Sequence, residues 1–228
     1  MPRQKRVAAS WGCGFSPGAG FSSLEIHGRQ RVWYMFDPRH KIILTGYRAT
    51  GKSSVGPLLA QRLGLDFLDM DGLIEERAGC RIRELVASRG WDHFRALERD
   101  LLAELVSRGN AVISTGGGAI LHQGVWPQLA QTGLVVWLAA DIDTICRRLQ
   151  GDGKSSSQRP SLTGADIYTE VALVLAEREP LYAKGSHLTI DTSAKSVAEI
   201  VARIEEALAD EDFLRRVQEA LPKTHLYC

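Results

Sequence analysis

The sequence is poor in the features that mark several classes of protein. Its 228 residues include only four cysteines, none in C-x-x-C spacing, which disfavours a disulfide framework or a zinc site and favours reduced thiols. No apolar run approaches the ~18 residues of a membrane-spanning helix. The formal net charge is only +1, so no overall field points to a nucleic-acid partner. We therefore expect a cytoplasmic globular protein that binds neither membrane nor nucleic acid.

The first 34 residues differ in composition from the rest of the chain. They carry scattered glycines and basic side chains with one acidic residue, Glu25, and no apolar segment follows the basic start, which disfavours a signal peptide. We expect residues 1–34 to be a poorly ordered extension, with Met35 as an alternative start. A basic arm that binds nucleic acid is the alternative reading of this segment.

The remaining chain alternates between strand-like and helix-like patterns. Short apolar runs predict strands at 41–44, 66–69, 111–114, 134–138 and 188–191. Helical patterns cover 52–63, 71–78, 82–89, 92–108, 120–131, 141–149, 166–183 and a stretch from about 196. This order predicts an α/β domain over 35–206, with a parallel five-stranded sheet and helices on both faces. A polar loop fills 151–164, and 207–228 forms a helical tail to which we assign no function.

Residues 46–53 match the pattern G-x-x-x-x-G-K-[ST] of a phosphate-binding loop. The loop stands between an apolar strand and a helix, so its backbone N–H groups and the helix N-terminus point at one anion. Lys52 is expected to reach the β- and γ-phosphates, and the Ser53 hydroxyl to join the shell of Mg²⁺. The chain is therefore predicted to bind a nucleoside triphosphate.

Five further motifs follow, at the carboxyl ends of predicted strands, in predicted helices and, for one of them, in the polar loop 151–164. They are Asp69-Met70-Asp71, Phe94-Arg95-Ala96-Leu97-Glu98, Gly116-Gly117-Gly118, Gln158-Arg159-Pro160 and Glu177-Arg178-Glu179-Pro180-Leu181-Tyr182. Because parallel strands end at one edge of the sheet, side chains of the motifs that follow them are expected to meet there. Taken alone, the pair Asp69 and Asp71 is also typical of a cap on the next helix.

Together with the phosphate loop, these motifs resemble the shikimate kinase family over roughly residues 41–205. The resemblance implies a three-layer P-loop kinase fold and transfer of the γ-phosphate of ATP to the 3-hydroxyl of shikimate, with Mg²⁺. It also implies the site residues. Those for ATP are Gly46, Ala49, Thr50, Gly51, Lys52, Ser53, Ser54, Arg148, Arg159 and Lys195. Those for the substrate are Asp71, Arg95, Gly116, Gly117, Gly118 and Arg178, with Ser53 and Asp69 for the metal and Lys52, Asp71 and Arg159 for catalysis.

These implied roles agree with the chemistry of the residues. Planar guanidinium groups bind a carboxylate bidentately, which suits Arg95 and Arg178 to an anionic ring acid. Lys52, Mg²⁺ and Arg159 would neutralise the transferred phosphoryl group, while Asp71 would orient the acceptor hydroxyl and take its proton. Glu98 is expected to orient Arg95 from one helical turn away. Closure of a lid over 151–164 would exclude water.

Several positions depart from the family's pattern. The lid is longer, with 154–157 inserted, which weakens the assignment of Arg148 as the arginine that stacks on adenine. Ser161 replaces a leucine, Val86 stands where an aromatic residue often lines the acceptor pocket, and Lys195 takes the place of an adenine-edge arginine. We expect altered affinities and an intact phosphate-transfer centre.

Three other readings stay open. A kinase of another small polyol acid, such as gluconate, could use the same fold, because fold does not fix substrate. A nucleoside-monophosphate kinase needs a second base pocket, for which the segment 71–98 is short. A catalytically silent regulatory domain would have no need to keep the whole set of catalytic side chains. A monomer is the expected oligomeric state for a single domain of this composition.

Overall fold

In the computed structural model, residues 40–151 and 166–220 are described. The predictions for 1–34, for the lid and its Arg159, and for 221–228 lie outside the described residues, and so do Ser161 and the inserted 154–157. The described residues belong to one compact unit, Met35–Cys228.

A parallel five-stranded sheet forms the centre of the domain, as the sequence predicted. Its strands are β1 (Lys41–Thr45), β2 (Asp66–Asp69), β3 (Ala111–Ser114), β4 (Leu134–Ala139) and β5 (Leu188–Asp191). Their order in the sheet is β2-β3-β1-β4-β5, with β1 in the middle. Ser114 is in register with both Leu44 and Asp69, so the segments that follow β1, β2 and β3 begin at the same edge of the sheet.

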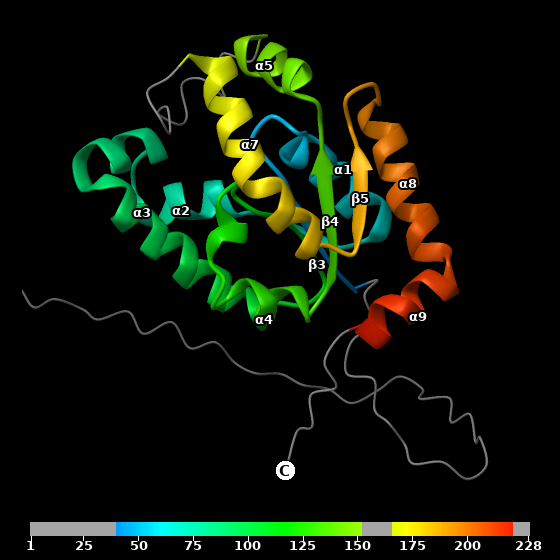
Figure 1. Ribbon diagram of the computed structural model, residues 1–228. Helices are drawn as coiled ribbons and strands as arrows, with labels where there is room; N and C mark the ends of the chain where they lie inside the picture. The colour runs from blue at the N-terminus through cyan, green and yellow to red at the C-terminus, as the bar shows by residue number, and fades with distance from the viewer. Residues whose placement is uncertain (1–39, 152–165, 221–228) are drawn as a thin grey trace, which may run out of the picture. The chain divides into compact units, whose positions relative to one another are not determined.

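Helices cover both faces of this sheet (Figure 1). They are α1 (Lys52–Leu63), α2 (Met70–Ala78), α3 (Ile82–Val106), α4 (Trp126–Ala130), α5 (Ile142–Gly151), α7 (Ile167–Lys184), α8 (Val197–Ala209) and α9 (Glu211–Ala220). Alternate residues of a strand point to opposite faces. On one face Ile43 packs with α3, α4 and the end of α7, and on the other Ile42 and Leu44 pack with α1, α8 and α9. The three-layer prediction is confirmed.

The two helical patterns at 82–89 and 92–108 are confirmed. They lie on either side of a break within α3 at Gly90, where φ is 80° and ψ is 169° and the backbone is not helical. The predicted helix at 120–131 is wrong. It is a short 3-10 turn, Ala119–Leu121, followed by α4, which places Pro127 in its first turn. A proline is tolerated there because its missing N–H has no helical partner, so the helix starts late.

A third apolar cluster lies beyond the sheet, next to the phosphate loop. Tyr47 of the loop is 1% exposed and packs with Ile145 of α5 and with Val171 and Leu175 of α7. The loop is therefore attached to helices that follow it by about a hundred residues in the sequence. Within the described residues, no helix is both long and apolar enough to cross a membrane.

Candidate active site

Backbone conformation and hydrogen bonds within the phosphate loop define its shape. Gly46 has φ 134°, and a Cβ at this position would overlap the carbonyl oxygen of Leu138. Ala49 has φ 61°, which is uncommon for a residue with a side chain and typical of functional loops. The Thr50 hydroxyl donates to the Tyr47 carbonyl at 2.8 Å. The backbone is thus already folded around the space that a phosphate would fill.

Lys52 is held inside this loop. Its Nζ donates to the carbonyl oxygens of Gly46 at 2.8 Å and Tyr47 at 2.7 Å, and the residue is only 8% exposed. Gly51 precedes it with φ 99° and accepts the N–H of Val55 through its carbonyl at 2.8 Å, which starts α1. The Lys52 ammonium group therefore lies at the N-terminus of α1. Its charge and the partial positive charge of the helix end both favour binding of an anion.

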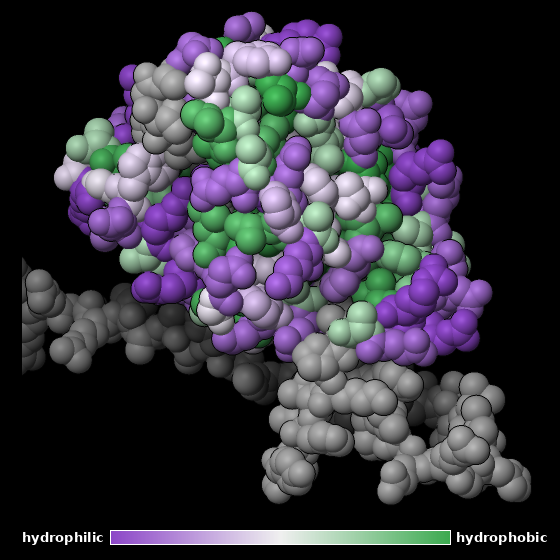
Figure 2. Space-filling view, in the orientation of Figure 1, coloured by the Kyte–Doolittle hydropathy of each residue, from purple (hydrophilic) through white to green (hydrophobic). Residues whose placement is uncertain are grey.

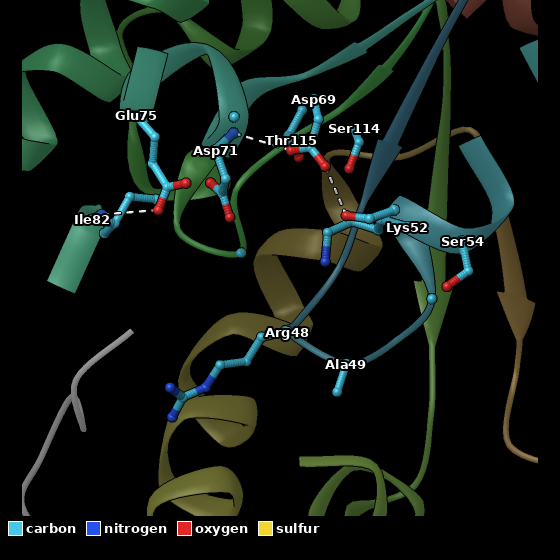
Figure 3. Close-up of a pocket in the computed structure, with 14 residues that line it drawn as sticks. Arg48, Ala49, Lys52, Ser54, Asp69, Asp71, Glu75, Ile82, Ser114 and Thr115 are labelled. Atoms are coloured by element: carbon cyan, nitrogen blue, oxygen red, sulfur yellow. Dashed lines mark hydrogen bonds between the residues drawn. The ribbon is translucent and has the colours of Figure 1, made fainter. Parts of the chain in front are cut away.

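Two oxygens suited to a divalent cation meet beside the lysine (Figure 3). Ser53 Oγ donates to Asp69 Oδ2 at 2.8 Å. Asp69 Oδ1 accepts the N–H of Asp71 at 3.1 Å, so Asp69 also caps α2, and the capping alternative is part of its role. Burial, and then the negative charge of Asp71, raise the pKa of Asp69. Mg²⁺ prefers oxygen ligands, so the Ser53 hydroxyl and the Asp69 carboxylate are suited to it. A bound cation would also lower the pKa of Asp69 by compensating its negative charge.

A cavity of about 340 Å³ opens between the loop and the first turn of α2. Its lining residues are Arg48, Ala49, Gly51, Lys52, Ser53, Ser54, Asp69, Asp71, Gly72, Glu75, Ile82, Ser114, Thr115 and Gly117. In Figure 3 Asp71 projects from α2 on one side of the cavity, and Lys52 and Ser54 lie on the other side, on α1. Predicted residues for phosphate and metal therefore share one cavity with two of the predicted acceptor residues, Asp71 and Gly117. The other predicted acceptor residues, Arg95, Gly116, Gly118 and Arg178, are not among its lining residues.

Arg95 lies against the triple glycine. A Cβ on Gly118 would overlap its guanidinium, so the close approach requires glycine. Arg95 Nη1 donates to Glu98 Oε2 at 2.5 Å, and the same oxygen lies 3.0 Å from His122 Nε2. Glu98 is fully buried. The guanidinium carbon stands 5.4 Å from the ring centre of Trp91, within cation–π range. The expectation that Glu98 orients Arg95 agrees with these contacts.

Arg178 approaches the same glycines from α7. It is 7% exposed, and its Nη1 donates to the Gly117 carbonyl at 3.0 Å. The Tyr182 hydroxyl donates to this carbonyl at 2.5 Å, and burial raises the pKa of that hydroxyl. Arg178 Nε is buried and has no hydrogen-bond partner among the described residues. A buried cation with a spare donor is suited to an anionic group.

The other residues predicted for ATP lie on the far side of the loop. Arg148 donates to the carbonyl oxygens of Ala49 at 3.2 Å and Thr192 at 2.6 Å, so it ties the loop to the segment after β5. Lys195 lines a separate groove beside β5, α8 and α9, near Asp191 and Glu199. The structure does not bring it into the cavity of the phosphate loop.

Sequence reasoning missed three partners of the site. Arg48 forms an ion pair with Glu170 of α7, which is 2% exposed. Glu75 accepts the N–H of Ile82 at 3.0 Å and so fixes one wall of the cavity. His122 joins the Arg95–Glu98 pair. Only the acidic Glu170 within an otherwise apolar stripe of α7 gave a signal, because a buried carboxylate requires a cation.

Comparisons with known protein families and sequences agree on one family. The family model described as shikimate kinase matches residues 48–209. The shikimate kinase of Nitratidesulfovibrio vulgaris is 43% identical over 169 residues, which are 74% of this chain and 95% of that protein. The shikimate kinase of Rhodopirellula baltica is 41% identical and covers 73% of this chain and 89% of its own length.

Solved structures agree with this kinship. The shikimate kinase of Acinetobacter baumannii in complex with shikimate superposes with a TM-score of 0.69 at 32% identity, covering 75% of this chain and 93% of that one. The shikimate kinase of Bacteroides thetaiotaomicron gives 0.66 at 33% identity, covering 74% and 98%.

Proposed function

This chain belongs to the shikimate kinase family, and we propose that it transfers the γ-phosphoryl group of ATP to the 3-hydroxyl of shikimate, giving shikimate 3-phosphate for aromatic amino-acid synthesis. The observation that carries the proposal is the meeting of Arg95 and Arg178 at Gly117 and Gly118, next to the loop that holds Lys52. Two guanidinium groups beside a phosphate site fit an anionic acceptor.

The donor side of the site comprises Gly46–Ser53, Ser54, Asp69 and Arg148. In the proposed complex the loop amides and Lys52 hold the β- and γ-phosphates, and adenine lies near Arg148, with Lys195 at its edge. Lys52 would leave the two carbonyl oxygens that it now contacts and turn to the phosphates. Arg159, outside the described residues, would add a second positive charge to the transferred group.

Ser53 and Asp69 are the residues that would hold Mg²⁺, since their oxygens already lie 2.8 Å apart and Asp69 has an unfavourably buried charge. The metal, when bound, neutralises charge on the phosphates. Two protein oxygens are enough because Mg²⁺ completes its shell with phosphate and water.

The acceptor side of the site comprises Asp71, Arg95, Gly116–118 and Arg178. The two arginines would bind the carboxylate of shikimate, and the glycines let its ring approach the backbone. Asp71 lines the cavity together with Lys52, so its carboxylate can orient the attacking hydroxyl toward the γ-phosphoryl group and accept its proton.

We also propose that the enzyme acts as a monomer in the cytoplasm. On the face shown in Figure 2, apolar areas are interrupted by polar ones. Among the described residues, Tyr168 and Leu173 are the large hydrophobic side chains with high exposure, and both belong to α7. Such isolated residues do not form the extended apolar patch of an obligate interface. Gel filtration with light scattering tests the oligomeric state.

The function is tested with a coupled assay for ADP in the presence of ATP and Mg²⁺. Shikimate, gluconate and AMP are offered separately at equal concentrations, and shikimate alone is expected to give turnover. Preference for gluconate or AMP would replace the proposed acceptor. Turnover with none of the three would favour a regulatory domain that has kept the binding loop.

A further inference from the structure

The ion pair between Arg48 and Glu170 joins the phosphate loop to α7. Arg48 is the third residue of the loop, and Glu170 lies in the first turn of α7. The side chains of Arg48 and Glu170 are 19% and 3% exposed, so the carboxylate is removed from water and its charge depends on partners within the protein. In Figure 3 Arg48 extends away from Asp71 and toward the helix.

Helix α7 meets the same stretch of loop at a second point. A Cβ on Gly117 would stand 3.4 Å from both the Arg48 nitrogen and the Gly46 oxygen, so this glycine lies on the loop backbone. The carbonyl of Gly117 is held by Arg178 and Tyr182, both on α7. Glu170 and Arg178 are eight residues apart, which is about 12 Å along a helix.

We propose that Arg48 and Glu170 are positioning residues for the acceptor: their ion pair fixes the beginning of α7 on the phosphate loop and thereby sets the place of Arg178, about two turns farther along. The inference rests on the proposed function, because it concerns the arginine assigned to the shikimate carboxylate. According to this inference Arg48, which belongs to the loop for ATP, affects the binding of shikimate.

Other contacts could attach α7 without the ion pair. Tyr47 packs against Val171, Val174 and Leu175, and this apolar contact is not directional. A charge-assisted hydrogen bond fixes distance and angle much more narrowly. The guanidinium of Arg48 also stands 5.5 Å from the Tyr47 ring centre, which limits the orientations it can adopt. We therefore expect the apolar cluster to keep α7 packed against the loop, and the ion pair to determine where along and around its axis the helix lies.

The test compares Glu170→Gln and Arg48→Met with the unchanged full-length enzyme, measuring kcat and the KM values of both substrates. The Glu170 side chain is 3% exposed and its carboxylate is paired with Arg48, so we expect an effect of its substitution to act through Arg48 and not through contact with a substrate. We expect the KM for shikimate to rise about tenfold in each variant and in the double variant alike, and the KM for ATP to change less than about twofold. Arg48→Lys should restore part of the shikimate affinity.

Glu205→Gln is the matched control, because it also removes one carboxylate from an Arg–Glu pair, that of Arg62 on α1 with α8. It should leave both KM values unchanged. Circular dichroism and the melting temperature confirm that each variant is folded. An unchanged KM for shikimate in folded Glu170→Gln would overturn the inference, and a larger effect on ATP than on shikimate would do the same.

The two proposals can fail separately. If the unchanged enzyme neither binds nor phosphorylates shikimate, the proposed function fails and the inference falls with it. If that enzyme phosphorylates shikimate and Glu170→Gln does so with an unaltered KM, the function stands and only the positioning role is wrong.

Discussion

The donor and acceptor sides of the site are built in opposite ways. The centre of the donor side is one continuous segment, Gly46–Ser53, whose shape comes from positive φ angles and hydrogen bonds within the loop, with Asp69 and Arg148 added from elsewhere in the chain. The acceptor side assembles side chains from α2, α3 and α7 around a backbone segment after β3, and it depends on buried charges such as Glu98 and Arg178. The backbone shape of the phosphate loop is thus mostly local, although distant helices hold the loop in place, whereas the acceptor site exists only where three helices come together.

The largest effect is expected on the donor side, from Lys52→Met. This change removes the cation that faces the transferred phosphoryl group, so kcat should fall by about 10² to 10³-fold. The fold should survive, because the loop is also held by the hydrogen bond from the Thr50 hydroxyl to the Tyr47 carbonyl and by the apolar packing of Tyr47 against α5 and α7. Steady-state rates at saturating substrates measure the loss.

Arg62→Met is the control for Lys52→Met, since Arg62 is an exposed cation at the other end of α1. Its kcat should equal that of the unchanged enzyme. A Lys52→Met enzyme within tenfold of normal kcat would show that the loop backbone alone supports transfer.

On the acceptor side, Glu98→Gln should weaken both substrate binding and stability. The substitution leaves Arg95 and His122 sharing a neutral partner, so the free energy of unfolding should fall by about 2–4 kcal/mol. The KM for shikimate should rise about tenfold, while the KM for ATP stays within about twofold. Urea denaturation and initial rates provide the two measurements.

Glu104→Gln supplies the matched control on the same helix, because Glu104 pairs with Arg77 in an exposed position. Glu104→Gln should lower the free energy of unfolding by less than about 1 kcal/mol. If Glu98→Gln and Glu104→Gln lost the same free energy of unfolding, the burial of Glu98 would not explain its contribution to the acceptor side.

Asp69→Asn should make the metal-free protein more stable while reducing its activity. Burial and then Asp71 raise the pKa of Asp69 above its unfolded value, so the ionised carboxylate costs stability at any pH above the folded pKa. Asparagine removes that charge and keeps a good helix cap. We expect a gain of about 1 kcal/mol at pH 7 that fades as the pH falls through the folded pKa and is absent below the unfolded pKa of about 4.

The gain is measured by urea unfolding of both proteins without Mg²⁺, at neutral pH and near pH 4. A gain that does not depend on pH would assign the effect to packing, and a loss of stability at pH 7 would contradict the electrostatic explanation.

The difference between the two sides also explains what the sequence could predict. The strand bounds and the loop at 46–53 follow from patterns a few residues long, and the five-stranded sheet confirms that prediction. The late start of α4 was missed because the apolar residues of 120–131 outweighed Pro127. The acidic Glu170 in an apolar stripe indicates a buried partner but not which one, and His122 gives no signal, since side-chain pairs 122 and 24 residues apart leave no periodic trace. Tertiary contacts of this kind appear only once the fold is known.

The smallest effect is expected from Lys195→Ala, at the margin of the donor side. Lys195 is half-buried near Asp191 and Glu199, whose carboxylates compete with a nucleotide for its charge. An ammonium group is well hydrated and binds a neutral base edge weakly, so the KM for ATP should rise by no more than about threefold. The KM for shikimate should not change, because Lys195 lines a groove apart from the acceptor residues. Titration of the variant with ATP and with ADP measures the dissociation constant of each nucleotide. A rise of more than about tenfold in these constants would make Lys195 a primary nucleotide ligand and extend the donor side well beyond the loop.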